Sequence, residues 1–140
     1  MNPQDVKILV GWRMDEVAES LDDARLLLSR GQGARSIVNR AYYAAFYGVL
    51  ALLQTVGEIP RKHKGAISSF ERLFVRTGHL PRECTKQIHE LFEIRLEDDY
   101  ERVEPVPMEQ AVHSLEVAEQ FVKEVRGYLT REGFLAEPKD

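Results

Sequence analysis

The sequence predicts an all-α protein, an antiparallel bundle of four to five helices that forms a single domain over residues 1–140. Apolar residues recur at spacings of three and four throughout the chain, whereas alternation at the period of a β-strand is hard to find. A chain of 140 residues with 44% hydrophobic residues can bury one sizeable core. The segments between the expected helices are short, so consecutive helices should lie antiparallel.

The first two helices are expected to be long. An apolar stripe from Val6 to Leu28 predicts the first helix, with Gly11 as a point where it could break and Gly31 and Gly33 as its end. The most apolar segment, SIVNRAYYAAFYGVLALLQTVG, predicts a central helix that is buried on most sides. One ridge of this helix carries mostly small side chains, where another backbone can approach closely: Ala41, Ala45, Gly48 and Leu52.

Three further helices are expected in the second half of the chain. Apolar spacing and the positions of proline and glycine predict them at residues 65–77, 82–101 and 108–129. The polar end of the chain, residues 131–140, is expected to be a frayed tail. The packed core is therefore predicted to span about residues 12–130.

Charge is distributed unevenly along the chain. The net charge of −4 argues against a general nucleic-acid binder. Residues 60–86, however, hold seven basic and two acidic side chains, a local charge of +5, which leaves −9 for the rest. The asymmetry suits a phosphate-bearing partner on one face, and a simple solvated helix face is the alternative.

Several classes of protein are disfavoured by composition and motifs. The single Cys84 excludes an internal disulfide, and no Cys or His spacing suggests a metal site, so no metal or cofactor is expected. Glycine-rich phosphate loops, GxSxG and HExxH are absent. No secretory leader or membrane-spanning run is seen, and we expect a soluble, unprocessed protein of the cytoplasm that does not contact the membrane.

The stretch EIRLEDDYE places charged residues where the expected fourth helix should be apolar. The stripe that begins at Cys84 continues by the same spacing to Arg95 and Asp99. These two residues are either a buried ion pair or the floor of a pocket. Asp98 and Asp99 lie near the helix C-terminus, where the dipole disfavours each by about 0.3–1 kcal/mol, and this weakens the ion-pair explanation.

The central helix carries a second group of polar residues. Arg40, Tyr43 and Tyr47 share one face of the helix. Tyrosines on a buried helix usually pack by their rings and find one hydrogen bond for the hydroxyl. The alternative is that these residues line a polar pocket facing Arg95.

His63 is the histidine with the most informative surroundings. It lies between Lys62 and Lys64 in RKHKG, just before an expected helix start, where backbone N–H groups and basic side chains can hold a phosphate. The alternative is a solvated histidine in a loop.

Three segments together resemble the small stand-alone HEPN-domain proteins of prokaryotes (higher eukaryotes and prokaryotes nucleotide-binding domain). They are NRAYYAAFYGVLALL, then KHKG with FERLFVRTGHLP, and then LFEIRLEDDY before a last amphipathic helix. The resemblance covers roughly residues 12–130. It implies a helical bundle, usually a homodimer whose inner helices meet near the site.

The resemblance also implies a range of activities. Many HEPN proteins are metal-independent RNases with an Arg-x(4–6)-His motif, others are binding modules without activity, and several are encoded beside a minimal nucleotidyltransferase antitoxin. Arg95 would be the arginine of the motif, but the positions allowed for the histidine hold Tyr100, Glu101 and Arg102. A tyrosine titrates near pH 10 and is a poor base at pH 7.

Two main functional hypotheses follow from the residues and the resemblance. The first is a module of a toxin–antitoxin or similar system that binds a nucleotide, RNA or a nucleotidyltransferase partner. Its ligand-binding residues would be Arg40, Tyr43, Tyr47, Lys62, Lys64 and Tyr100. The second is a metal-independent ribonuclease toxin with a non-standard site, whose catalytic residues would be Arg95, Asp99 and His63. A third hypothesis is a structural adaptor without a ligand.

Overall fold

The computed structural model describes residues 1–96 and 104–137. Within these residues there are five α-helices and no strand, which confirms the predicted all-α fold. The helices are α1 (Pro3–Ser29), α2 (Ala34–Thr55), α3 (His63–Phe70), α4 (Glu83–Leu96) and α5 (Met108–Arg131), and a short π-helix, η1 (Glu71–Val75), continues α3.

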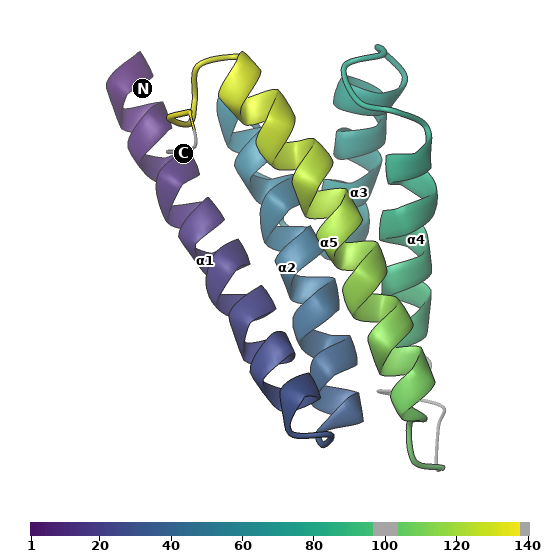
Figure 1. Cartoon of the computed structure of the whole chain (residues 1–140). Helices are drawn as coiled ribbons and strands as arrows, with labels where there is room; N and C mark the ends of the chain where they lie inside the picture. The colour runs from purple at the N-terminus through teal and green to yellow at the C-terminus, as the bar shows by residue number, and fades with distance from the viewer. Residues whose placement is uncertain (97–103, 138–140) are drawn as a thin grey trace.

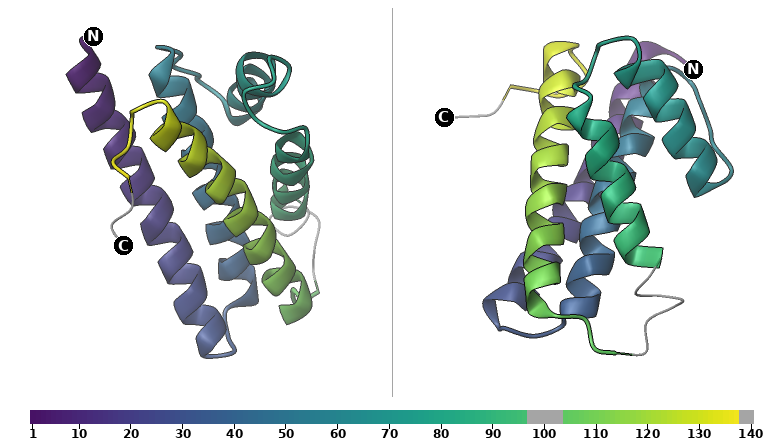
Figure 2. Two further views of the ribbon diagram at one scale, coloured as in Figure 1. Left: turned by 45° about the horizontal axis from the view of Figure 1, so that its top comes forward. Right: turned by 90° about the vertical axis from the view of Figure 1, so that its right-hand side faces the viewer.

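The four long helices α1, α2, α4 and α5 run alternately up and down, so consecutive long helices are antiparallel (Figure 1). Helix α2 is central, because it contacts α1, α3, α4 and α5. The short α3 with η1 stands beside α4 and is tilted against the bundle (Figure 2). This arrangement brings the start of α3 and the end of α4 to the same side of α2.

Helix α1 is continuous through Gly11, so the break that was considered there does not occur. Its start is capped by the side chain of Asn2, which accepts a hydrogen bond from the backbone N–H of Asp5 at 2.9 Å. The chain then turns through Gly33, which has a left-handed φ of 75°. A side chain there would also meet Leu27, because a Cβ atom would lie 3.2 Å from it.

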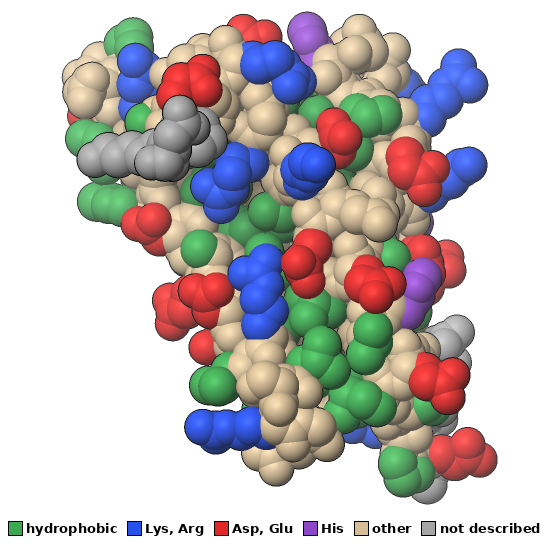
Figure 3. All heavy atoms as spheres, in the orientation of Figure 1, with side chains coloured by type: hydrophobic (Ala, Val, Ile, Leu, Met, Phe, Trp, Pro, Cys, Tyr) green, Lys and Arg blue, Asp and Glu red, His purple; other side chains and the backbone are tan. Residues whose placement is uncertain are grey.

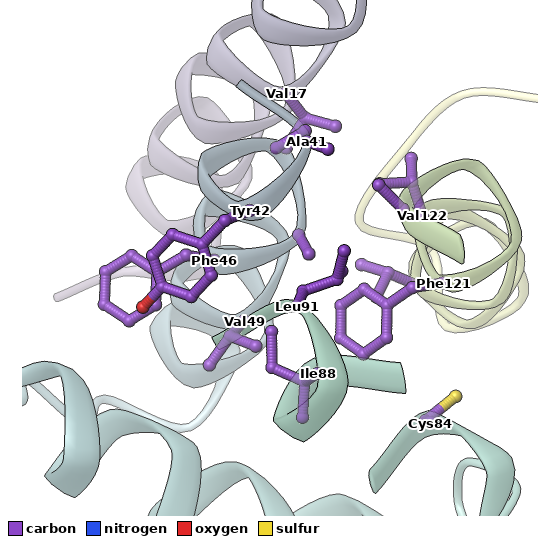
Figure 4. Packing of buried hydrophobic residues seen from close by; sticks show 14 of the residues in the cluster. Val17, Ala41, Tyr42, Phe46, Val49, Cys84, Ile88, Leu91, Phe121 and Val122 are labelled. Atoms are coloured by element: carbon purple, nitrogen blue, oxygen red, sulfur yellow. The ribbon is translucent and has the colours of Figure 1, made fainter. Parts of the chain in front are cut away.

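The small-residue ridge of α2 is buried inside the bundle, and Gly48 on this ridge faces α5 of the same chain. Ala41, Ala45 and Gly48 face the core, and a Cβ atom on Gly48 would lie 3.6 Å from Val125. Figure 4 shows the core between α2, α4 and α5, where Phe121 lies close to residues of the other two helices. The close approach that this ridge permits is therefore used inside the chain.

The segment expected as one helix over residues 65–77 begins earlier and changes form. It starts at His63, and residues 71–75 adopt the wider turn of a π-helix. Phe70 and Phe74 are both buried, the first against Phe121 and the second against Tyr128, with ring centroids 5.6 Å apart in each pair. The packing of these aromatic rings anchors the α3–η1 unit to α5.

Within the described residues, helices α4 and α5 differ at their C-terminal ends from the expected helices. Helix α4 is described as far as Leu96, and the remainder of the expected helix, including Asp98, Asp99, Tyr100 and Glu101, lies outside the described residues. After α5, the chain folds back rather than leaving the bundle at once, since the N–H of Phe134 donates to the carbonyl of Leu129 at 2.8 Å. Phe134 and Leu135 pack partly against the core.

Candidate functional site

Five side chains from three helices meet at the junction of α2, α3 and α4. Tyr42, Tyr43 and Phe46 come from α2, His63 is the first residue of α3, and Arg95 lies in the last turn of α4. We call these five residues the Arg95 cluster. The rings of Tyr42 and Phe46 lie side by side on one face of α2 (Figure 4). The structure thus brings together three residues that the sequence analysis named as candidate site residues: Arg95, Tyr43 and His63.

His63 is held by contacts with two aromatic residues of α2. Its ring stacks on Phe46 with centroids 4.1 Å apart, and its Nδ1 atom lies 2.8 Å from the hydroxyl oxygen of Tyr42. Burial raises the pKa of Tyr42, and Arg95 offsets this only in part, so the hydroxyl stays protonated at neutral pH. A protonated hydroxyl can donate to Nδ1 or accept from Nδ1–H, so it can serve either neutral tautomer of the imidazole.

The surroundings of His63 favour its neutral form. Burial of the ring lowers the pKa of His63 below its ordinary value, and the positive charge of Arg95 lowers it further. The imidazole is therefore neutral at pH 7 and available for proton transfer. Because the folded pKa lies below the unfolded one, the contribution of His63 to stability is present above about pH 6.5 and is lost as the pH falls from there through the folded pKa.

We predict that NMR titration of the imidazole signals will show His63 protonating below the ordinary pKa of about 6.5. Arg95→Gln should raise this pKa, because the nearby charge is removed, but should not restore it fully, because burial remains. Arg126→Gln is the matched control, since Arg126 is exposed on α5. A His63 pKa at or above 6.5, or an equal shift in both variants, would contradict this account.

Arg95 lies against two tyrosine rings. Its guanidinium carbon is 5.1 Å from the ring centroid of Tyr42 and 5.2 Å from that of Tyr43. Nη2 of Arg95 also donates a hydrogen bond to the hydroxyl of Tyr43 at 3.2 Å. Cation–π contacts of this kind orient a planar guanidinium and leave it able to bind a planar anion. The proposed ion pair with Asp99 lies outside the described residues.

Tyr42 and Phe46 are the members of the cluster that the sequence pattern did not single out. Both lie on one face of α2 and are buried, as core residues are, and Tyr42 is fully buried. Its hydroxyl nevertheless contacts His63, and its ring lies 5.8 Å from that of Phe92. The available signal was chemical, because a buried tyrosine usually needs a hydrogen-bond partner for its hydroxyl.

The other residues that were expected to bind a ligand differ in whether they adjoin the Arg95 cluster. Tyr47 is half-buried, and its ring lies 5.8 Å from that of Tyr43. Arg40 is exposed and lines a separate surface pocket with Asn39. Lys62 and Lys64 are exposed on either side of His63. Asp99 and Tyr100 lie outside the described residues.

The described residues form no metal-binding cluster, and the thiol of Cys84 is not reactive. Over residues 1–96 and 104–137, no group of three or more His, Cys, Asp or Glu side chains is placed to hold a metal ion. Cys84 is buried, and burial raises the pKa of its thiol to about 12, so the reactive thiolate is not formed at neutral pH. Within the part of the chain that is described, no helix is both long and apolar enough to span a membrane.

Comparison with known proteins identifies the family. The HEPN domain family matches residues 12–128. The chain belongs to the HEPN family. This confirms the resemblance seen in the RAYYAAFY and LFEIRLEDDY segments, and the Arg95 cluster can now be described as part of a HEPN domain.

Three relatives of the HEPN protein are informative. A UPF0332 protein of Thermotoga maritima is 40% identical over 116 residues, which cover 83% of this chain and 86% of the relative. In Methanocaldococcus jannaschii, a protein named "Putative toxin MJ0142" is 32% identical over 74% of this chain and 70% of its own length. Another from the same organism, "Putative toxin MJ0605", is 33% identical over 79% of this chain and 82% of its own length.

Proposed function

We propose that this HEPN protein is a toxin-like module of the cytoplasm that binds single-stranded RNA at the Arg95 cluster. The observation that carries the proposal is the position of the Arg95 guanidinium, held against Tyr42 and Tyr43 beside the neutral imidazole of His63. A guanidinium matches the geometry of a phosphate, and the partly exposed ring of Tyr43 can stack on an unpaired base.

Two further observations support RNA as the ligand. Exposed Lys62 and Lys64 flank His63, so positive charge surrounds the entrance to the cluster and would favour a polyanion. Two relatives carry the name of a toxin, and the HEPN family as a whole includes RNases. By the same family likeness we propose that the protein acts as a homodimer and pairs with a minimal nucleotidyltransferase.

A second candidate function, metal-independent RNA cleavage, is favoured by the position of His63. Although the usual motif histidine is missing, His63 joins Arg95 in one cluster, and Tyr42 holds its Nδ1. Nε2 of the neutral ring could take the proton of a 2′-hydroxyl, whose oxygen then bonds to the adjacent phosphorus. The bond from phosphorus to the 5′-oxygen breaks, that oxygen receives a proton from water, and Arg95 stabilises the charge on the phosphoryl oxygens.

The test uses purified full-length protein with labelled single-stranded and duplex RNA of one sequence, in EDTA. We expect saturable binding of the single strand that is tighter than binding of the duplex. Intact RNA after prolonged incubation would identify a binding module, whereas cleavage in EDTA that is lost in His63→Asn would identify the ribonuclease. Expression of the protein should also slow cell growth. Normal growth together with no binding of single-stranded RNA would overturn the proposal.

A further inference from the structure

We infer that the groove between the α3–η1 unit and α4 is an extended RNA site. In this arrangement, a strand bound at the Arg95 cluster continues along the groove and its phosphates reach a basic pocket at the far end. The inference rests on the proposed RNA binding and adds a second contact region to it. It predicts that the ligand is an extended single strand rather than a mononucleotide.

The near end of the groove adjoins the Arg95 cluster. A surface pocket of about 390 Å³ is lined there by Lys64 and Ser68 of α3 and by Phe92, Glu93 and Leu96 of α4, among others. Lys64 follows His63 directly, and the Phe92 ring lies 5.8 Å from the Tyr42 ring of the cluster. A strand leaving the cluster therefore meets a cation and an aromatic ring, which suit a phosphate and an unpaired base.

The far end of the groove is strongly basic. A second surface pocket of about 490 Å³ lies between η1 and the start of α4. Its lining contains the cations Arg76, Arg82 and Lys86 and one carboxylate, that of Glu71. The three cations are exposed, and Glu71 is already hydrogen-bonded by His89. In Figure 3, Lys and Arg side chains gather along the right-hand edge of the molecule at the top, whereas both signs are mixed on the face formed by α1 and α5.

The two pockets lie next to each other between the α3–η1 unit and α4. Glu71 lines the far pocket and His89 lines the near one, and these two side chains are in direct contact at the boundary. The lining residues recur at helical spacing on one face of α4, from Lys86 through His89 to Leu96, and Arg82 directly precedes the helix. The 14 residues of α4 correspond to about 21 Å at 1.5 Å per residue, which is longer than one nucleotide.

The test compares Arg82→Glu/Lys86→Glu with Lys7→Glu/Arg126→Glu. Both variants change the net charge equally, but Lys7 and Arg126 are exposed on α1 and α5. New carboxylates at the residue before α4 and at position 86 lie near the N-terminus of the helix and are compatible with its dipole, so the groove variant should fold, and its melting curve will check this. The ligands are a 20-nucleotide oligouridylate and the dinucleotide UpU.

For the 20-mer, we expect the groove variant to bind at least about tenfold more weakly than wild type. The slope of log K against log salt should become shallower by about 0.7 for each lost phosphate contact. Binding of UpU should be unchanged, and the control variant should match wild type with both ligands.

Equal losses in the two variants, or an equal loss for UpU and the 20-mer, would overturn the inference while leaving RNA binding at the cluster intact. Failure of wild type to bind either ligand would instead overturn the proposed function.

Discussion

Replacing Arg95 with alanine is expected to weaken the binding of single-stranded RNA by about 10- to 150-fold. This range corresponds to the loss of one charge-assisted hydrogen-bonded contact worth about 1.5–3 kcal/mol. The guanidinium is the group of the cluster best suited to a phosphate, and Tyr42 and Tyr43 hold it in place. Fluorescence anisotropy with a labelled oligonucleotide measures the change. If expression of the wild-type protein slows growth, Arg95→Ala should relieve the effect.

Two controls separate this loss of binding from a loss of folding. Arg95→Lys keeps the charge but removes the planar guanidinium group with its paired N–H donors. The RNA affinity of this variant should therefore fall between those of wild type and Arg95→Ala. The melting temperature should fall by no more than about 2–7 °C in Arg95→Ala, since the cation–π contacts contribute about 0.5–2 kcal/mol, and by less in Arg95→Lys, which keeps the charge. A clear drop in melting temperature with unchanged RNA affinity would show that Arg95 is structural, as the adaptor hypothesis requires.

Replacing Phe121 with alanine is expected to lower the free energy of unfolding by about 3–5 kcal/mol. Phe121 is fully buried on α5, where its ring packs edge-to-face on Phe70 at 5.6 Å and lies close to Gly48 of α2. Truncation would leave a cavity at the point where α2, α3 and α5 meet. Because the total stability of a domain is commonly about 5–15 kcal/mol, this single change could remove a large share of it.

Urea unfolding followed by circular dichroism measures this loss. Phe134→Ala is the matched control, because Phe134 is only partly buried where the chain folds back after α5. Its cost should be well below that of Phe121→Ala, since less apolar surface is exposed and no enclosed cavity forms. Similar losses in the two variants would contradict the central position assigned to Phe121.

The candidate site illustrates how far helical spacing can be used. The spacing placed Arg40, Tyr43 and Tyr47 on one face of α2. In the structure Tyr43 contacts Arg95 directly and Tyr47 lies beside Tyr43, whereas Arg40 lines a separate pocket. Spacing describes the direction in which a residue leaves the helix, but the neighbouring helices decide which part of that face is covered. Tyr42 shows the converse, because a residue on the core stripe can still present its hydroxyl to the site.

The helices, most of their bounds and the buried stripes could be predicted from the sequence, because these follow from local periodicity and from proline and glycine. The segments that resemble HEPN proteins also identified the family. Which polar residues meet depends on the packing of the helices. His63 is 21 residues from Tyr42 along the chain, and Arg95 is 52 residues from Tyr43. Their contacts depend on how α3 and α4 pack against α2, and no pattern within a single helix contains that information.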